Sequence, residues 1–236
     1  MPALPLPAAP HRDPRALERT TRRAARLVAA ALRAGRQSAN DAFDRFLPEE
    51  LRAVSDQYWT PLPVVRRAAL WLRETQVHSV IDIGSGAGKF CVAAALLTRC
   101  HIVGVEHRAS LVAAARELAG IFEVDDRVAF THGDLDAVTG SGVDAYYVFN
   151  PFGEYAFDSP HFTDPDVTFS SETQRRDIAA VNAMLSRAPI GTFVITYNGF
   201  GGKIPAHYEQ IDVATRLPGT LRLWKKHGLQ ARAETP

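Results

Sequence analysis

The stretch that decides the fold is Val80-Ile81-Asp82-Ile83-Gly84-Ser85-Gly86-Ala87-Gly88-Lys89, in which a nearly all-apolar run meets three closely spaced glycines. The apolar run, which starts at residue 78, predicts a strand in a parallel sheet that is covered on both faces. The glycines allow a sharp turn out of the strand and let a ligand lie against bare backbone. Residues 90–97 then predict a helix, whose first amide groups can bind a carboxylate or a phosphate. This strand–loop–helix junction predicts a site for a nucleoside cofactor.

Residues 102–106 predict the next strand, which ends in an acidic residue, Glu106, 18 residues after Gly88. A carboxylate at this place can accept two hydrogen bonds from the hydroxyls of a ribose. Further strand-like runs at 128–131, 145–149 and 192–197 alternate with helical runs at 110–119 and 173–187. This alternation predicts an α/β fold with a doubly wound, mostly parallel sheet.

The end of the chain departs from this alternation. Two strand-like runs, 208–216 and 220–226, are joined by Leu217-Pro218-Gly219 with no helix between them. A short turn joins antiparallel strands, whereas a parallel pair needs a crossover of about a dozen residues or more. We therefore predict a seven-stranded, mostly parallel sheet that ends in an antiparallel hairpin.

The N-terminal part is helical in pattern and basic in charge. Residues 1–14 hold five prolines and predict a disordered tail, and helices are predicted at 15–33 and 64–73 with shorter helical segments between them. Residues 1–36 contain eight arginines against two acidic residues, although the net charge of the whole chain is only +1. This basic arm is interpreted either as a solvated surface helix or as an arm that contacts nucleic acid or an acidic protein.

The composition, with 46% apolar and 22% charged residues among 236, is that of an ordinary globular protein. No run of about 18 apolar residues occurs, so we expect no membrane-spanning segment. Cys91 and Cys100 fit neither a disulfide framework nor a zinc pattern. We therefore expect two reduced thiols, no metal site and a cytoplasmic location. The oligomeric state is not predicted.

The glycine spacing distinguishes between two kinds of nucleoside cofactor. A dinucleotide-binding loop has the pattern G-x-G-x-x-G, whereas this loop has G-x-G-x-G, with Asp82 before it and Lys89 after it. In these features the chain resembles the class I S-adenosylmethionine-dependent methyltransferases, and a dinucleotide oxidoreductase is the alternative. The resemblance implies that the loop holds the methionine part of S-adenosylmethionine and that Glu106 holds its ribose. It also implies that Asp134, after the third strand, contacts the adenine.

A second motif, Phe149-Asn150-Pro151-Phe152-Gly153, follows the predicted fourth strand. It resembles the (N/D)-P-P-(Y/F) signature of methyltransferases that act on amino groups, although one proline is missing. The chain is also similar to nucleosomal lysine methyltransferases, in which the second strand ends in a Gly-Val-Glu like residues 104–106. The resemblance implies catalytic roles for Asn150, which accepts a hydrogen bond from the target amine, and for Phe152, which flanks that amine. The alternative interpretation of Asn-Pro is an ordinary turn after a strand.

Two further segments are expected to line the site. Tyr58-Trp59-Thr60-Pro61 is similar to a segment that packs over the cofactor in amino-group methyltransferases, although it would also suit a simple helix start. The aromatic and polar loop 154–171 is expected to form the rim of the substrate site, because loops of this length in compact domains are usually functional. The predicted cofactor-binding residues are Tyr58, Thr60, Pro61, Asp82, Gly84, Ser85, Gly86, Gly88, Lys89, Glu106, Asp134, Leu135 and Asn150. The predicted substrate contacts are Pro151, Tyr155, Phe157, Phe162 and Tyr197.

Together these features predict an S-adenosylmethionine-dependent N-methyltransferase that acts on a protein side chain, with lysine as the expected acceptor. Three alternatives stay open: a nucleic-acid amino-methyltransferase that uses the basic arm, a small-molecule methyltransferase, and a cofactor-binding module without catalysis. The expected organisation is a tail at 1–14, a helical extension at 15–57, the methyltransferase domain at 58–228 and a C-terminal tail at 229–236.

Overall fold

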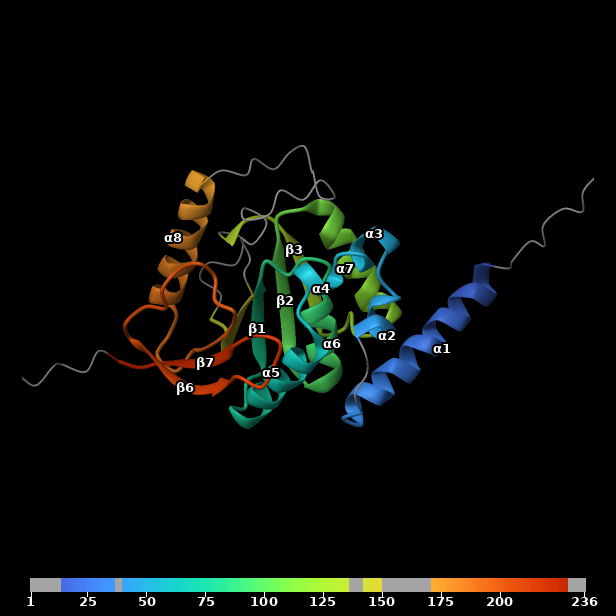
Figure 1. Cartoon of the computed structure of the whole chain (residues 1–236), viewed down its shortest axis with the longest axis horizontal. Coiled ribbons are helices and arrows are strands. Elements are labelled where there is room, and N and C mark those ends of the chain that lie inside the picture. The colour runs from blue at the N-terminus through green and yellow to red at the C-terminus, as the bar shows by residue number, and fades with distance from the viewer. Residues whose placement is uncertain (1–13, 37–39, 136–141, 150–170, 229–236) are drawn as a thin grey trace, which may run out of the picture.

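A seven-stranded sheet forms the centre of the computed structural model, which describes residues 14–36, 40–135, 142–149 and 171–228 (Figure 1). Its strands are β1 (Ser79–Ile83), β2 (His101–Glu106), β3 (Val128–His132), β4 (Ala145–Phe149), β5 (Phe193–Tyr197), β6 (Tyr208–Ala214) and β7 (Leu221–Lys226). They lie in the order β3-β2-β1-β4-β5-β7-β6. The first five strands are parallel, and β7 runs antiparallel to both β5 and β6. The predicted mostly parallel sheet with a closing antiparallel hairpin is confirmed.

Successive residues of the central strands pack on opposite faces of the sheet. On β4, Tyr147 belongs to the core beside α5 (Leu62–Glu74), α6 (Lys89–Leu97) and α7 (Ala109–Ile121), whereas Tyr146 and Val148 belong to the core under α8 (Ser171–Arg187). The strands are therefore buried on both sides, which explains their almost continuous apolar runs. None of the helices in the described ranges is long and apolar enough to cross a membrane.

Within the described residues, one long and three short helices precede α5: α1 (Pro14–Arg33), α2 (Asn40–Asp44), α3 (Glu49–Arg52) and α4 (Ser55–Tyr58). α1 lies against α6 and α7, and its first turns extend beyond the body of the protein (Figure 1). Ala25, Ala29 and Leu32 of α1 are buried. α2 inserts Phe43, whose ring stacks on that of Phe122 with centroids 4.6 Å apart. The N-terminal helices therefore share one hydrophobic core with the sheet.

The C-terminal hairpin is fastened to α8 by the ammonium group of Lys226. This residue ends β7, and its Nζ donates to the carbonyl oxygens of Leu185, Ser186 and Ala188 at distances of 3.2, 2.6 and 2.6 Å. The last carbonyls of a helix have no partner within the helix, and they carry the negative end of its dipole. The buried cation satisfies these groups, so it holds β7 against the end of α8.

Candidate active site

The predicted loop and strand-end residues that the structure describes lie at the carboxyl edge of the parallel strands. β1 stands between β2 and β4, so the strand order reverses direction at this point of the sheet. Open α/β sheets bind their ligands in the crevice outside the carboxyl ends of the strands at such a switch point. The glycine loop 84–88 leaves β1 here, Glu106 ends β2, and Phe149 ends β4.

The glycine loop is fixed by backbone contacts to β2. The amides of Gly84 and Ser85 both donate to the carbonyl oxygen of Val105, 3.0 Å away. Gly86 has a φ of +53°, a conformation that side chains disfavour. A Cβ at Gly86 would also lie 2.2 Å from the indole ring of Trp59. The centre of the loop therefore requires glycine, because backbone and ring approach each other so closely.

Glu106 is a buried carboxylate that ties the end of β2 to the glycine loop. Its Oε2 accepts a hydrogen bond from the amide of Gly86 at 2.9 Å, and its Oε1 accepts one from the amide of Arg108 at 3.0 Å. Nδ1 of His107 lies 3.3 Å from Oε1. A carboxylate has about four lone-pair sites, so Glu106 keeps capacity for further donors such as the hydroxyls of a ribose.

Asp82 lies on β1 as a second buried acid. The thiol of Cys91 donates to its Oδ2 over 3.1 Å. Burial raises the pKa of Asp82 to about 7, the hydrogen bond from Cys91 lowers it, and the charge of Glu106 raises it. Burial also raises the pKa of Cys91, so the thiol stays protonated and can donate. Asp82 therefore changes its protonation state near neutral pH.

Residues 58–61 form a wall over the glycine loop. Trp59, whose ring covers the loop, donates from its indole nitrogen to the carbonyl oxygen of Leu51 at 3.1 Å. The hydroxyl oxygens of Thr60 and Tyr147 lie 2.9 Å apart, which joins the wall to β4. The Tyr147 ring in turn stacks on Phe90 of α6, with centroids 3.5 Å apart. The segment that was predicted to cover the cofactor thus packs directly on the loop that was predicted to bind it.

The side chain of Lys89 is part of a buried ion pair. Its Nζ lies 2.8 Å from Oδ1 and 2.9 Å from Oδ2 of Asp44, and it donates to the hydroxyl of Ser55 at 3.0 Å. Burial lowers the pKa of Lys89, and the neighbouring charge of Asp44 raises it. Because these groups engage the ammonium, any contact of Lys89 with a cofactor falls to its backbone amide at the start of α6.

Other predicted residues flank this centre along the same edge. The amide of Gly133 donates to the last carbonyl of β2 at 3.0 Å, so β3 continues into the exposed Asp134 and the half-buried Leu135 beside that strand. On the opposite side, the ring of Tyr197 at the end of β5 lies 4.7 Å from that of Phe149. The structure thus brings the predicted residues of β1, β2, β3 and β5 to one edge.

Three further residues take simple structural positions. The hydroxyl of Ser85 lies against β2, where a Cβ on Gly104 would be only 2.6 Å from it. The ring of Tyr58 lies 6.2 Å from that of Trp59, and Pro61 caps the start of α5. The predicted catalytic and substrate residues Asn150, Pro151, Phe152, Tyr155, Phe157 and Phe162 lie outside the described residues.

Sequence patterns missed four residues that build this centre: Asp44, Ser55, Trp59 and Tyr147. Asp44 and Ser55 precede the nucleoside-binding motif and have no fixed spacing from it. The one available signal was the lysine at the start of an apolar helix, because a buried ammonium needs a buried acid. The buried lysine thus indicates that a buried acid is present, but it does not indicate which residue is that acid.

Comparisons with known proteins agree with this geometry. A family model described as a methyltransferase domain matches residues 75–174. An RNA methyltransferase from Salinibacter ruber, solved in complex with S-adenosyl-L-homocysteine, superposes with a TM-score of 0.52 at 20% identity, over 75% of this chain and 99% of that chain. A methyltransferase from Geobacter sulfurreducens superposes with a TM-score of 0.54 at 17% identity, over 78% of this chain and 93% of that chain. No curated protein matches the sequence.

These findings define the fold and one part of the chain. The sheet has the class I methyltransferase fold, residues 75–174 match a methyltransferase domain, and the N-terminal helices pack on the same core. The solved structures share 20% identity or less with this chain, so they show its fold. Their substrates are not transferred to this chain. The residues at the carboxyl edge fit the cofactor, since a glycine loop, a helix start and a buried acid meet there.

Proposed function

We propose that three parts of the carboxyl edge bind S-adenosylmethionine. The glycine loop and the first amides of α6 hold the methionine carboxylate, Glu106 accepts hydrogen bonds from the ribose, and Asp134 with Leu135 flanks the adenine. Support comes from the contacts of Glu106, which anchors Gly86 and still has lone pairs for a ligand. The wall formed by residues 58–61 completes the site from the side of the N-terminal helices.

We further propose that the enzyme methylates an amino nitrogen and that the acceptor is a lysine side chain of a protein. The observation that supports an amine acceptor is the register of β4: Val148 pairs with Ile83, so Phe149 is level with the start of the glycine loop and Asn150 follows it in the sequence. The side-chain oxygen of an asparagine can accept a hydrogen bond from an amine and orient the lone pair of that amine. S-adenosylmethionine supplies an electrophilic methyl group, so a lysine must lose its proton before it attacks.

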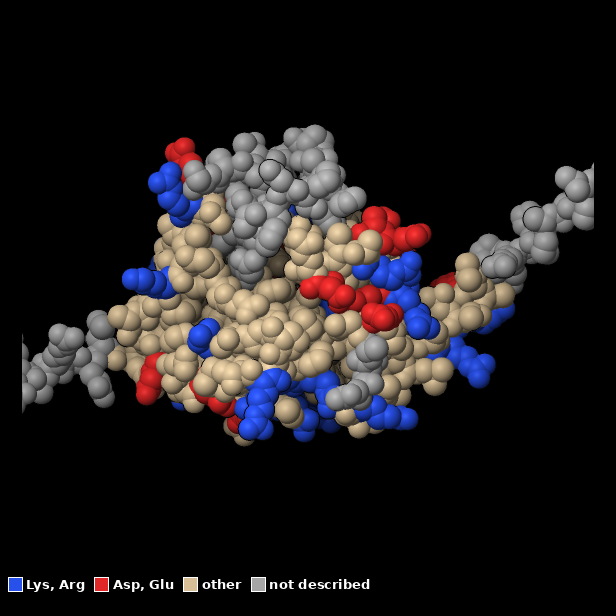
Figure 2. Space-filling model, viewed as in Figure 1, with Lys and Arg blue, Asp and Glu red and all other residues tan. Residues whose placement is uncertain are grey.

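The surface of the segment from α2 to α4 favours a basic protein segment as the acceptor. The exposed acidic residues of this segment are Asp41, Glu49, Glu50 and Asp56, against the two exposed arginines Arg45 and Arg52. Figure 2 shows acidic side chains gathered over α3 and α4 on the upper right of the molecule. These helices lie beside the glycine loop, because α4 leads directly into Trp59. An acidic surface there attracts a lysine-bearing segment and repels a phosphate backbone.

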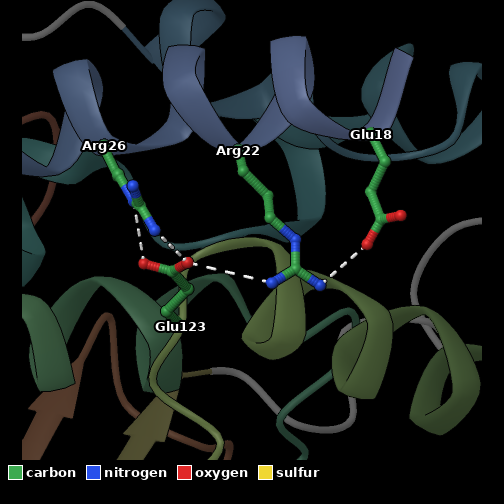
Figure 3. A network of polar contacts seen from close by, with 4 residues as sticks. All are labelled: Glu18, Arg22, Arg26 and Glu123. Carbon is green, nitrogen blue, oxygen red and sulfur yellow. Dashed lines mark hydrogen bonds and ion pairs between the residues drawn. The ribbon is translucent and has the colours of Figure 1, made fainter. Parts of the chain in front are cut away.

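The arginines of α1 are partly engaged within the chain, which disfavours a nucleic-acid acceptor. Arg26 contacts both carboxylate oxygens of Glu123, at 2.6 and 3.0 Å (Figure 3). Arg22 lies 3.8 Å from the same carboxylate and 2.9 Å from that of Glu18. These carboxylates neutralise part of the positive charge of α1 that binding to phosphate groups would require. They support the interpretation of the basic arm as a helix that docks on the domain.

Transfer of label from a cofactor with a tritiated methyl group tests the acceptor class. The purified protein is incubated with cell lysate, and the products are treated with protease or nuclease before they are separated by size. We expect the label in protein, and we expect acid hydrolysis to release it as methyllysine. Label that nuclease releases, or that passes a small-molecule filter before any treatment, would contradict a protein acceptor.

Replacement of Asn150 tests the position of the amine. In Asn150→Ala, turnover should fall by about a hundredfold, because the acceptor loses the group that orients it. Affinity for S-adenosylhomocysteine, measured by calorimetry, should stay close to that of the unchanged protein. An equal loss of both quantities would show that Asn150 binds the cofactor and does not orient the acceptor.

A further inference from the structure

The ion pair between Lys89 and Asp44 joins the glycine loop to the N-terminal helices. Lys89 is the first residue of α6, directly after the last glycine of the loop. Asp44 ends α2, and Ser55 begins α4. The side chains of Lys89 and Asp44 are only 1% and 4% exposed. A charged contact between segments 45 residues apart in sequence therefore lies inside the protein, at the point where the loop becomes a helix.

Two hydrogen bonds and one further close contact fix the geometry of this ion pair. Nζ of Lys89 donates to Oδ2 of Asp44 and to the hydroxyl oxygen of Ser55. It also lies 2.8 Å from Oδ1 of Asp44, a buried oxygen that accepts no hydrogen bond within the described residues. Ser55 itself donates to Oδ2 of Asp44 at 2.6 Å. A buried network of charged groups and hydrogen bonds favours one geometry. Its contribution to stability is a weaker explanation, because apolar residues of similar volume often replace buried ion pairs without loss of stability.

We propose that Lys89 and Asp44 are positioning residues for S-adenosylmethionine, because their ion pair fixes the end of the glycine loop in the geometry that the cofactor requires. This proposal rests on the proposed cofactor site. The loop contains glycines with positive φ at positions 86 and 88, so its backbone has unusual freedom. Glu106 fixes the loop at Gly86, and the ion pair fixes it where α6 starts. A loop that is already ordered loses less entropy when the ligand binds.

The variant Asp44→Asn tests the proposal, since it keeps the shape of the side chain and removes its charge. Affinity for S-adenosylhomocysteine is measured by calorimetry at a temperature where circular dichroism shows the folded state. We expect affinity to fall about tenfold. The matched control is Phe43→Leu, the neighbouring position in α2, whose ring stacks on Phe122. This control should lower the melting temperature while affinity stays unchanged.

A double variant, Asp44→Leu with Lys89→Met, keeps the test valid if a lone buried charge prevents folding. It removes both charges, so it should fold, and it should still bind S-adenosylhomocysteine about tenfold more weakly. Wild-type affinity in the double variant, or an equal loss in Phe43→Leu, would overturn the positioning role. Glu106→Ala distinguishes a failure of the positioning role from a failure of the proposed cofactor site. If Glu106→Ala weakens binding and Asp44→Asn does not, only the positioning role fails; if Glu106→Ala has no effect, the cofactor site itself is wrong.

Discussion

Replacement of Glu106 by alanine should weaken the binding of S-adenosylhomocysteine by two orders of magnitude. The Glu106 carboxylate already accepts hydrogen bonds from the amides of Gly86 and Arg108, and we expect its remaining lone pairs to accept two ribose hydroxyls. A hydrogen bond to a charged group contributes about 1.5–3 kcal/mol. Two such bonds at the lower value amount to about 3 kcal/mol, or roughly a 150-fold change in the dissociation constant.

The assay is titration calorimetry with S-adenosylhomocysteine on purified protein. Glu106→Gln is the graded variant, because its carbonyl oxygen can still accept a hydrogen bond from Gly86 while the charge is lost; we expect a decrease of about tenfold. Glu117→Ala, which removes an exposed acid from α7, is the matched control and should bind like the unchanged protein. Equal affinities of the unchanged protein, Glu106→Ala and Glu106→Gln would refute the ribose assignment.

Three further predictions concern pH, the loop and the N-terminal helix. The pKa of Asp82 is raised from 3.8 to about 7, so its proton stabilises the folded state below about pH 4, and this contribution is lost as the pH rises through about 7. Urea titrations should therefore show a falling free energy of unfolding between about pH 4 and pH 7, and a flatter profile for Asp82→Asn, in which the amide oxygen can still accept from Cys91. Gly86→Ala should lower both melting temperature and cofactor affinity, because a Cβ would lie 2.2 Å from the Trp59 ring; adding Trp59→Leu should recover part of the loss, and no recovery would contradict this cause. Glu123→Ala should loosen α1, seen as faster amide exchange in that helix alone, and unchanged exchange would show that the Arg26 contact does not hold it.

The parts of the fold that follow from local periodicity could be predicted from the sequence. The apolar run before Gly84 and the acid at the end of the next strand were enough to place Glu106 beside the glycine loop, because parallel strands end at one edge. The short turn at 217–219 predicted the antiparallel pairing of β6 with β7 for a similar reason. In both cases the position of a residue within its element determined its neighbours in space.

The contacts of the N-terminal helices could not be predicted in this way. Asp44 and Lys89 lie on separate elements, and their pairing depends on how α2 and α4 pack on α6, which no sequence period records. The sequence motif predicted Tyr58 and Thr60 as cofactor-binding residues, yet the ring that covers Gly86 belongs to Trp59. Side-chain packing between elements selected the residue that covers Gly86, and the motif indicated only the segment.

The packing of α1 also decides how the basic arm must be tested. Ala25, Ala29 and Leu32 of this helix are buried in the common core, so removal of residues 1–36 would expose apolar surface as well as remove arginines. A loss of nucleic-acid binding after such a truncation would therefore not identify a phosphate contact. Charge-removing substitutions at the exposed Arg23 and Arg36 leave the core intact. If nucleic acid binds through α1 and the residues that follow it, these substitutions should weaken binding and reduce its salt dependence; an unchanged salt dependence would show that Arg23 and Arg36 make no phosphate contact.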